Sequence, residues 1–389
     1  MKKRYLPDYR GGSIVNLMAS IAGRFGCKTG YAQLKQLPSG DLRPYKKIIL
    51  LVLDGLGYHY LQKHGGDDWL KTNLHSKITS VFPSTTASSI TSFATGLPPD
   101  RHAITGWFVH FKELGTVSKV LFCQPRFGGG SFTQAGIDVK DLIGSGPISD
   151  KMKAHCFIVT PRFIADGPFT TATRGRAAIQ PYDDLPGLFA GMGSILKRAR
   201  SETFIYAYWP EVDHLCHLHG VDSPKVKAHF RDLDVRIARF WQSVKGDDVI
   251  LLVTADHGLI DTPRQKVIDL DKHPGLKQCL TLPLCGEPRV AYCYVHPDRV
   301  TQFRRYVSGH LGEACKLYSR AQMISQGFYG PGPADPRLAQ RIGDFALVME
   351  DGWCLKDFIW GEERFYLKAN HGGTTPQEML VPLVRACRK

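Results

Sequence analysis

Three apolar stretches of this chain each lead into an aspartate. The three pairs are residues 48–53 with Asp54, residues 204–208 with Asp213, and residues 249–253 with Asp256. Histidines follow two of these carboxylates, as His217 and His257, and a third histidine, His371, stands near the C-terminus. Carboxylate and imidazole groups together suit zinc or manganese better than calcium or magnesium. An aspartate after a strand is by itself typical of a turn or cap, and the joint occurrence of these groups is what predicts a metal site.

The elements that position these residues follow from the same pattern. In open α/β sheets, ligands bind beyond the carboxyl ends of the strands, so the three aspartates are expected at one shared edge. Asp213 and His217 are one helical turn apart and face the same way if the chain is helical there. Asp256 and His257 are neighbours, so both contact a metal only from a non-helical loop. We therefore expect a helix after the second strand and a loop after the third.

The remaining pattern predicts an α/β fold with a mainly parallel central sheet sandwiched by helices, because apolar strands alternate with helical segments. Helices are expected near residues 13–23, 86–95, 185–199 and 224–244. From about residue 260, Pro, Gly and charged residues interrupt shorter strand candidates. Residues 261–365 are interpreted as a smaller inserted α+β lobe, since His371 lies beyond them. The α/β core then comprises residues 1–260 and 366–389.

Composition limits the class of protein. The 389 residues are 43% hydrophobic and 22% charged, as in an ordinary globular protein. The net charge of +14 favours anionic partners, but the basic residues are spread along the chain. A solvated basic surface is therefore favoured over a dedicated polyanion site, and no stable nucleic-acid partner is expected.

Cysteines and hydropathy bear on the compartment. The ten cysteines form no paired framework and no C-x-x-C spacing, which favours reduced thiols and a cytoplasmic location. No apolar run approaches the ~18 residues that span a membrane, so no membrane partner is expected. No pattern in the sequence sets the oligomeric state.

A cluster of hydroxyl groups supplies a candidate nucleophile. Ser84, Thr85 and Thr86 precede or begin the helix expected at 86–95. The unpaired backbone N–H groups and the positive end of the helix dipole make such a terminus a phosphate site. The same hydroxyls are also typical helix caps. The two roles are compatible, so capping does not exclude catalysis.

Together these motifs resemble the alkaline phosphatase superfamily, and most closely its nucleotide pyrophosphatase/phosphodiesterase branch. The matching segments occur in the order of that family, and they are residues 52–55 (VLDG), 82–86 (FPSTT), 95–102 (TGLPPDRH), 213–220 (D-x-x-x-H-x-x-G), 254–258 (TADHG) and 371–373 (HGG). The 261–365 lobe has no counterpart in this comparison.

The resemblance implies a centre with two zinc ions, or with manganese or another divalent metal in their place. One group of ligands would be Asp213, His217 and His371, and the other would be Asp54, Asp256 and His257. The resemblance also identifies Thr86 as the nucleophile whose oxygen reaches the second metal and forms a phospho-threonine intermediate. Ser89 is expected to donate one hydrogen bond to a phosphate oxygen, where the branch generally uses an asparagine.

The resulting hypothesis is a metal-dependent phosphodiesterase or nucleotide pyrophosphatase that acts on a small, nucleotide-like phosphorylated substrate. The alternative is a phosphomonoesterase or phosphonate hydrolase with the same centre. A diesterase needs a pocket for the second substituent on phosphorus, whereas a monoesterase needs positive groups for the additional charge. A more distant alternative is a non-catalytic, basic polyanion-binding protein with a structural metal site.

Overall fold

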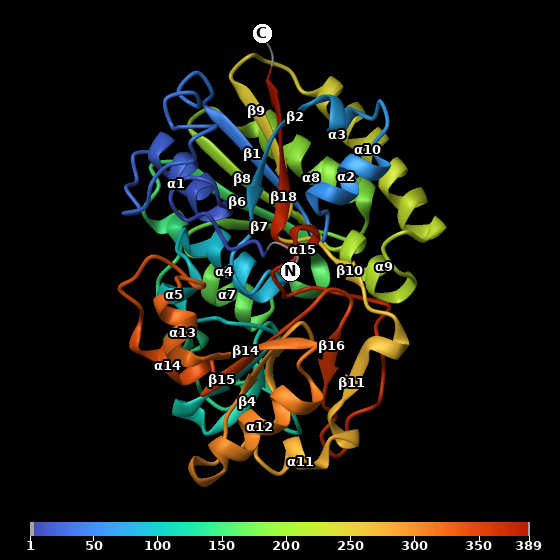
Figure 1. Cartoon of the computed structure of the whole chain (residues 1–389). Helices are drawn as coiled ribbons and strands as arrows, with labels where there is room; N and C mark the ends of the chain where they lie inside the picture. Colours follow the sequence, from blue (N-terminus) through green and yellow to red (C-terminus); the bar gives the residue numbers. More distant parts are fainter. Residues whose placement is uncertain (1–3, 388–389) are drawn as a thin grey trace.

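The sheet that carries the predicted site crosses the upper half of the molecule (Figure 1). The computed structural model describes residues 4–387. Within this range the sheet has seven strands, in the order β2 (Leu74–Thr79), β18 (Leu380–Cys387), β9 (Val249–Thr254), β1 (Lys47–Leu53), β8 (Thr203–Trp209), β6 (His155–Pro161) and β7 (Ala178–Tyr182). The pairs from β9 to β7 are parallel, and β18 is antiparallel to both of its neighbours. The prediction of a mainly parallel central sheet is confirmed.

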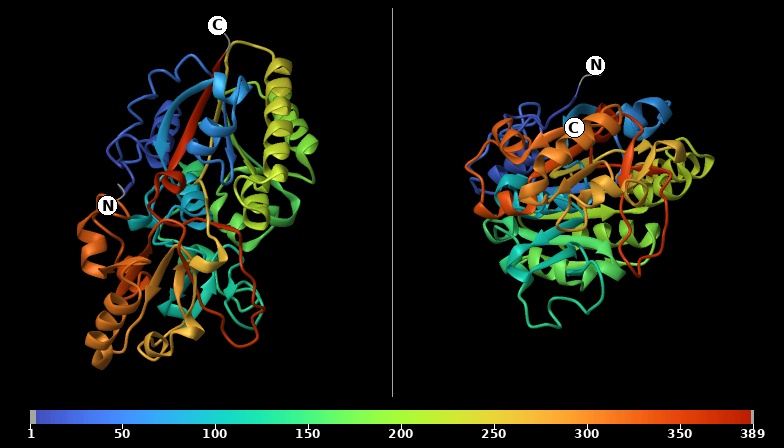
Figure 2. Two further views of the ribbon diagram at one scale, coloured as in Figure 1. Left: turned by 45° about the vertical axis from the view of Figure 1, so that its right-hand side comes forward. Right: turned by 60° about the horizontal axis from the view of Figure 1, so that its bottom comes forward.

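The central strands are apolar because helices cover both faces of the sheet. Every residue of β1 after Lys47 is buried. Helix α1 (Ile14–Arg24) and helix α10 (Pro224–Ser243) lie on opposite faces, as dark blue and yellow-green ribbons in the left view of Figure 2. Helix α8 (Leu185–Arg198) packs on β6, β7 and β8. All three helices occur where the sequence predicts them.

Local signals explain where these helices begin and end. Ser223 caps α10, since its hydroxyl accepts a hydrogen bond from the Val226 amide at 3.3 Å. Helix α4 (Thr86–Thr95) ends at Gly96, which adopts the left-handed conformation (φ 71°) that glycine accommodates most readily. The shorter helices beside this sheet are α2 (Tyr58–His64), α3 (Trp69–Thr72), α5 (Pro99–His102), α6 (Arg162–Ala165), α7 (Pro168–Thr173), α9 (Glu211–His219) and α15 (Pro376–Met379).

A second, antiparallel sheet lies below the first (Figure 1). In the described part of the chain it has the order β14 (Cys315–Ser319), β15 (Phe345–Met349), β13 (Val290–Cys293), β12 (Cys285–Glu287), β3 (Phe108–Phe111), β4 (Thr116–Lys119) and β5 (Gln124–Pro125). Four of its strands come from the expected lobe, and three come from residues 108–125. The domain division at residues 261–365 stays a prediction, and the sheet of that lobe is completed by an earlier part of the chain.

Helices and two strand pairs complete the second half of the fold. The helices are α11 (Pro274–Lys277), α12 (Val300–His310), α13 (Arg320–Ser325) and α14 (Pro336–Arg341). The strand pairs are β10 (Ile260–Asp261) with β17 (Ala369–Asn370), and β11 (Val267–Asp269) with β16 (Cys354–Lys356). Among residues 4–387, no helix has both the length and the apolar composition for crossing a membrane.

Candidate metal centre and active site

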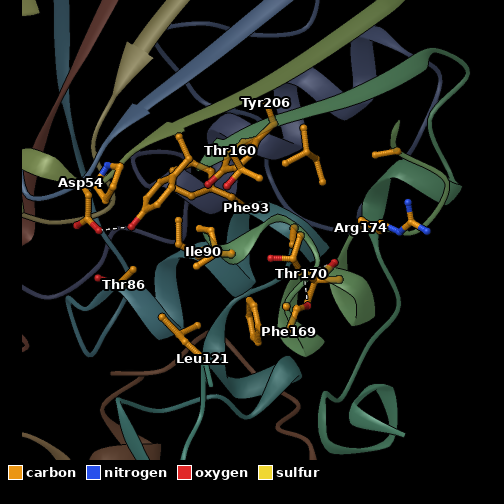
Figure 3. A pocket seen from close by; sticks show the side chains of 18 of the residues that line it. Asp54, Thr86, Ile90, Phe93, Leu121, Thr160, Phe169, Thr170, Arg174 and Tyr206 are labelled. Atoms are coloured by element: carbon orange, nitrogen blue, oxygen red, sulfur yellow. Dashed lines mark hydrogen bonds between the residues drawn. The ribbon is translucent and has the colours of Figure 1, made fainter. Parts of the chain in front are cut away.

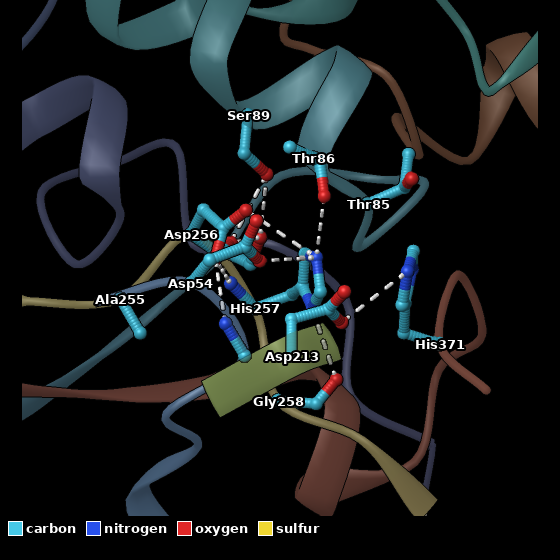
Figure 4. Close-up of polar contacts among 12 residues, drawn as sticks. Asp54, Thr85, Thr86, Ser89, Asp213, Ala255, Asp256, His257, Gly258 and His371 are labelled. Carbon is cyan, nitrogen blue, oxygen red and sulfur yellow. Dashed lines mark hydrogen bonds and ion pairs between the residues drawn. The ribbon is translucent and has the colours of Figure 1, made fainter. Parts of the chain in front are cut away.

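The predicted metal ligands meet at the carboxyl-terminal edge of the first sheet (Figure 4). Asp54 directly follows β1, and Asp213 lies in α9, just after β8. Asp256 and His257 follow β9 in a non-helical segment, as the spacing requires. His371 comes directly after β17, which is paired with β10. The ends of three parallel strands and the antiparallel β10–β17 pair thus bring residues more than 300 positions apart into one site.

The first group of ligands consists of Asp213, His217 and His371. Helix α9 places the Nε2 atom of His217 3.2 Å from Asp213 Oδ2. The Nε2 atom of His371 is 3.7 Å from Asp213 Oδ1. The other ring nitrogen of His217 bonds to the Ala369 carbonyl oxygen at 2.7 Å. Such a bond fixes the orientation of the His217 ring and leaves its Nε2 atom directed toward Asp213.

The second group consists of Asp54, Asp256 and His257, and all three side chains are buried. The Nε2 atom of His257 is 3.3 Å from Asp54 Oδ1 and also 3.3 Å from Asp256 Oδ2. The hydroxyl of Tyr208 donates to the other oxygen of Asp54, and the Gly55 amide donates to Asp256 Oδ1. The ring centroids of His257 and His371 lie 3.9 Å apart, so the two groups form one centre.

The donor atoms of both groups fit divalent metal ions. Within each group, one ligand atom per residue lies within 4.8 Å of the others, a spacing compatible with metal–ligand bonds of about 2 Å. Three buried carboxylate oxygens, on Asp54, Asp213 and Asp256, accept no hydrogen bond in the described structure. A buried anionic oxygen without a partner is costly, and a bound cation removes that cost.

Electrostatics within the centre also favour bound cations. Burial, followed by the charges of Asp256 and Asp213, raises the pKa of Asp54 well above its ordinary value. Burial likewise raises the pKa of Asp256. Burial opposes ionisation of Asp213, but His217 outweighs it and the pKa of Asp213 is lowered. Burial lowers the pKa of His371 and keeps the neutral imidazole that binds metals.

Thr86 is the hydroxyl that faces the centre. It is the first residue of α4, and its Oγ1 atom lies 3.1 Å from His257 Nε2 (Figure 4). The Thr85 hydroxyl instead donates to Glu287 at 2.6 Å, and the Ser84 hydroxyl donates to the Gly373 carbonyl at 2.9 Å. Both of those side chains are fully buried and engaged. The structure therefore separates one candidate nucleophile from two structural hydroxyls.

Ser89 makes its contacts with the segment that carries two of the candidate metal ligands. Ser89 is fully buried, and its hydroxyl donates to the Asp256 carbonyl oxygen at 3.0 Å. Ser80 contacts the same carbonyl and lies 3.1 Å from the Ser89 hydroxyl. Ser89 therefore supports the loop of Asp256 and His257 from behind, and its contact with a phosphate oxygen stays a prediction.

A protein-family model described as type I phosphodiesterase/nucleotide pyrophosphatase matches residues 48–374. The chain belongs to this family. The matched segment contains every predicted metal ligand and Thr86, so the resemblance inferred from the sequence is confirmed. Membership makes the protein a hydrolase of the superfamily and gives no support to the non-catalytic alternative.

Solved structures of several phosphodiesterase/nucleotide pyrophosphatase relatives share the fold. Murine ectonucleotide pyrophosphatase/phosphodiesterase 5 is 19% identical, with 87% of each chain covered and a TM-score of 0.65. An inactive threonine-to-alanine variant of that murine protein has been solved in complex with AMP. Phosphonoacetate hydrolase from Sinorhizobium meliloti 1021, in complex with phosphonoformate, is 17% identical over 87% of this chain and 89% of its own, with a TM-score of 0.63.

Two pockets meet at Thr86 in this family member. The larger pocket has a volume of about 440 Å³ and the smaller one about 310 Å³. Both are lined by Thr86, Asp213 and Trp107. The larger pocket extends along α4, and the smaller pocket extends toward Glu287 and Lys356 in the second half of the fold. A phosphorus atom bound at Thr86 therefore has space for a substituent on either side.

Glu287 is a residue of this site that the sequence does not reveal. Its buried carboxylate accepts hydrogen bonds from the Thr85 hydroxyl at 2.6 Å and from the Trp107 amide at 2.7 Å. It thereby ties the start of α4 to β12. Nothing in the spacing indicates this role, because Glu287 belongs to the lobe that matches no motif. Burial raises the pKa of Glu287 to about 7.

Replacement Glu287→Gln is expected to change the pH dependence of stability. The carboxyl titrates near 4.5 in the unfolded chain and near 7 in the folded one, so folded protein binds the additional proton and wild-type stability falls as pH rises through this window. Between pH 5 and pH 8, metal-free wild type should lose about 2.5 kcal/mol of unfolding free energy relative to Glu287→Gln. Urea denaturation of both chelator-stripped proteins measures this, and parallel pH profiles would contradict it.

A buried ion pair holds the loop that carries His371. Arg289 and Glu378 are fully buried, and the guanidinium donates to both carboxylate oxygens at 3.0 and 2.8 Å. Glu378 also accepts the Gly373 amide at 2.8 Å. The pair therefore joins the second sheet to the segment just after His371.

Replacement Arg289→Met should lower the unfolding free energy by about 3–5 kcal/mol, because it leaves the buried Glu378 charge without its partner. Chemical denaturation monitored by circular dichroism measures the change. The control is Arg236→Met, which breaks the exposed pair with Asp232 on α10 and should cost about 0.5 kcal/mol or less. Similar losses in the two variants would refute the bracing role of Arg289.

Proposed function

We propose that this protein is a two-zinc phosphodiesterase that hydrolyses phosphodiester or phosphoanhydride bonds through a phospho-threonine at Thr86. The observation that carries the proposal is the position of Thr86, whose hydroxyl lies 3.1 Å from His257 of the second ligand group at the point where two pockets meet. A diester fills both pockets with its two substituents, whereas a monoester leaves one of them without an occupant.

The chain supplies a nucleophile and a binding surface for the phosphoryl group. In the first step a bond forms between Thr86 Oγ1 and phosphorus, the bond from phosphorus to the leaving oxygen breaks, and the proton of the Thr86 hydroxyl ends on the leaving group. Backbone N–H groups at the start of the ten-residue helix α4 favour the anionic phosphoryl group there. Water then attacks phosphorus and releases the Thr86 oxygen. Bound divalent ions would make the hydroxyl more acidic and stabilise the negative charge.

Each metal would have three protein ligands from this chain. Asp213, His217 and His371 would hold one, and Asp54, Asp256 and His257 would hold the other. Mixed carboxylate and imidazole donors support zinc, and manganese is the alternative. Sets of three protein ligands are typical of catalytic rather than structural zinc sites.

The substrate is proposed to be a small phosphorylated molecule. The AMP complex of the murine relative supports a nucleotide as one candidate. The phosphonate complex of the bacterial relative supports phosphonate hydrolysis as a second candidate. Lys356 favours that second activity, because it lines the smaller pocket and its ammonium lies over the Phe365 ring, 4.6 Å from the ring centroid, within reach of an anionic substrate. A reducing, cytoplasmic location stays a prediction that rests on the ten cysteines.

The test of the proposed function compares bis-p-nitrophenyl phosphate with p-nitrophenyl phosphate. Zinc-loaded wild type should prefer the diester, and chelator-stripped protein should lose turnover of both compounds. A preference for the monoester would favour the phosphomonoesterase alternative, in which the same residues bind the metals. Turnover that survives both chelation and removal of the Thr86 hydroxyl would refute the proposed mechanism.

Replacement Lys356→Met should weaken the binding of doubly charged substrates more than that of singly charged ones. Burial lowers the pKa of Lys356, and Lys356 is the one lysine or arginine among the described residues that line the smaller pocket. We expect KM for p-nitrophenyl phosphate to rise about tenfold, equivalent to about 1.4 kcal/mol, with a smaller rise for the diester. Steady-state kinetics measures both, and Lys28→Met, at an exposed position, is the control. Equal effects on the two substrates would exclude charge recognition by Lys356.

A further inference from the structure

A cavity of about 470 Å³ lies at the edge of the first sheet that is opposite the metal centre. It is formed by the first residues of β6 and β7 and by the segment just before β8. Strands β6, β7, β8 and β1 are parallel, so these are amino-terminal strand ends, whereas the candidate metal ligands follow carboxyl-terminal ends. A strand of seven residues such as β6 spans about 20 Å. We call this space the distal cavity.

The distal cavity is separate from the larger pocket at the active site. Figure 3 shows that pocket between Asp54 and Thr86 on one side and Arg174 on the other. Cys156 and Phe157 line both spaces. Neither Thr86 nor any candidate metal ligand is among the described residues that line the distal cavity. A molecule bound in it would therefore not contact the reacting groups.

Positively charged side chains at the distal cavity have donors to spare. Lys153, His155 and Arg176 line it, and all three residues are exposed. The Lys153 ammonium and the His155 ring make no hydrogen bond or ion pair with other residues of the range 4–387. Arg176 Nε donates to the Ser149 carbonyl oxygen at 2.7 Å, and its two terminal nitrogens donate to no described residue. These donors are available to a ligand.

The acidic groups nearby are already engaged. Glu202 lines the cavity, but Arg24 binds both of its carboxylate oxygens, at 2.9 and 2.8 Å. Asp150 accepts a hydrogen bond from the Arg176 backbone amide at 2.7 Å. Within residues 4–387, neither the Lys153 ammonium nor the Arg176 guanidinium has an ion-pair partner. The cavity therefore presents a positive charge that no carboxylate pairs with.

The surroundings of the distal cavity are basic as well. Residues 149–157, 174–178 and 197–202 contain seven lysines and arginines and two acidic residues. The three segments meet because β7, β6 and β8 are neighbours in the sheet. Basic residues that are dispersed along the sequence are thus gathered by the fold on one side of the molecule. Such a concentration of one charge attracts anions.

We propose that the distal cavity is a second, non-catalytic binding site for a small phosphorylated organic molecule, with the phosphate group bound by Lys153 and Arg176. An arginine fork and a lysine point charge are the groups that proteins use for phosphate. The volume is in the range of about 300–1,000 Å³ typical of ligand sites, which is more than a phosphate ion requires. Phe157 and Ala178 supply apolar wall for the organic part.

The first experiment is calorimetric titration of zinc-loaded wild type with benzene-1,3-disulfonate. Its sulfonate groups have the tetrahedral shape and negative charge of phosphate groups, but they resist hydrolysis and bind zinc weakly. One molecule should bind per chain, and the affinity should fall as the salt concentration rises. Benzene-1,3-diol, which has the same ring without the charges, is the control ligand and should bind far more weakly. Absence of disulfonate binding, or equal affinities for the two compounds, would overturn the proposal.

A matched pair of variants at Ala178 locates the probe. Ala178 is the exposed first residue of β7 and lines the distal cavity. Ala178→Glu places a carboxylate there and should lower disulfonate affinity by about tenfold or more through repulsion. Ala178→Gln adds a side chain of nearly the same size without the charge, and its effect should be far smaller. Equal affinities of the two variants would show that the probe is not recognised by charge in this cavity.

Removal of single cations provides an independent test. Lys153→Met and Arg176→Met should each lower disulfonate affinity by about fivefold, the value of about 1 kcal/mol for an exposed charge pair. Lys356→Met, in the smaller pocket, should leave it unchanged. Circular dichroism checks that each variant is folded. A loss caused by Lys356→Met, with none caused by Lys153→Met, would place the probe at the active site and overturn the proposal.

The distal site and the proposed function fail independently of each other. Ala178→Glu lies at the opposite edge of the sheet from Thr86, so it should retain turnover of bis-p-nitrophenyl phosphate. Thr86-dependent turnover without disulfonate binding would overturn the distal site and leave the phosphodiesterase intact. Disulfonate binding that is sensitive to Ala178→Glu, together with diester turnover that persists without Thr86, would overturn the catalytic mechanism and leave the distal site intact.

Discussion

Thr86→Ala protein should lose diester turnover by about a thousandfold or more, as expected when a covalent nucleophile is removed, while it retains both metal ions. The separation of these effects follows from the geometry. Each ligand group has three residues other than Thr86, and the Thr86 hydroxyl contacts the second group only through His257, at 3.1 Å. Measurement of kcat with bis-p-nitrophenyl phosphate, together with metal content by mass spectrometry, tests both statements.

Neighbouring hydroxyls provide matched controls for this prediction. Thr86→Ser retains an oxygen at the same place and should retain part of the activity. Thr85→Ala removes a hydroxyl that donates to Glu287 rather than facing the metals, so its effect on kcat should be far smaller than that of Thr86→Ala. Comparable losses at positions 85 and 86 would show that the helix terminus matters only as a structural element. Normal turnover by Thr86→Ala would remove Thr86 as the nucleophile.

The meeting of the candidate metal ligands was predictable because these residues are tied to regular elements. Residues after three parallel strands must share one edge, and a helical turn must align Asp213 with His217. The sequence could not show which hydroxyl of Ser84, Thr85 and Thr86 faces the site. Their consecutive positions do not predict where their side chains point. Their separation depends on long-range partners, Glu287 and Gly373.

Other features depend on contacts that the sequence pattern does not contain. Ser89 is directed inward by its place on α4 and by the Asp256 carbonyl, which lies 167 positions away. The second sheet joins residues 108–125 to strands beyond residue 284, through the pairing of Phe108 with Gly286. Antiparallel strands of two to five residues lack the long apolar runs that identify β1 and β9. Their association is therefore determined by tertiary packing, which local periodicity does not encode.

Replacement Asp256→Ala should remove one metal ion and diester turnover together. Asp256 is fully buried, and its Oδ2 atom lies 3.3 Å from His257 Nε2 with no hydrogen-bond partner in the described structure. Its replacement leaves two ligands in the second group and does not change the three ligands of the first group. Metal content should fall from two ions to one, and kcat should fall by about a thousandfold or more. Retention of two ions would show that the ligand grouping is wrong.

The conservative variant Asp256→Asn separates the charge of this residue from its shape. Without metal, the wild-type protein holds three carboxylates together, and after burial the charge of Asp256 contributes to raising the pKa of Asp54. The pKa values of Asp54 and Asp256 are raised in the folded state, so the contribution of these two carboxyl groups to metal-free stability should fall as pH rises from acid to neutral. Metal-free Asp256→Asn should then be more stable than metal-free wild type at pH 8, and the order should reverse with zinc bound. Urea denaturation of the metal-free and the zinc-bound proteins tests this reversal. A residue with a purely structural role would not produce it, because its replacement would lower stability with and without zinc.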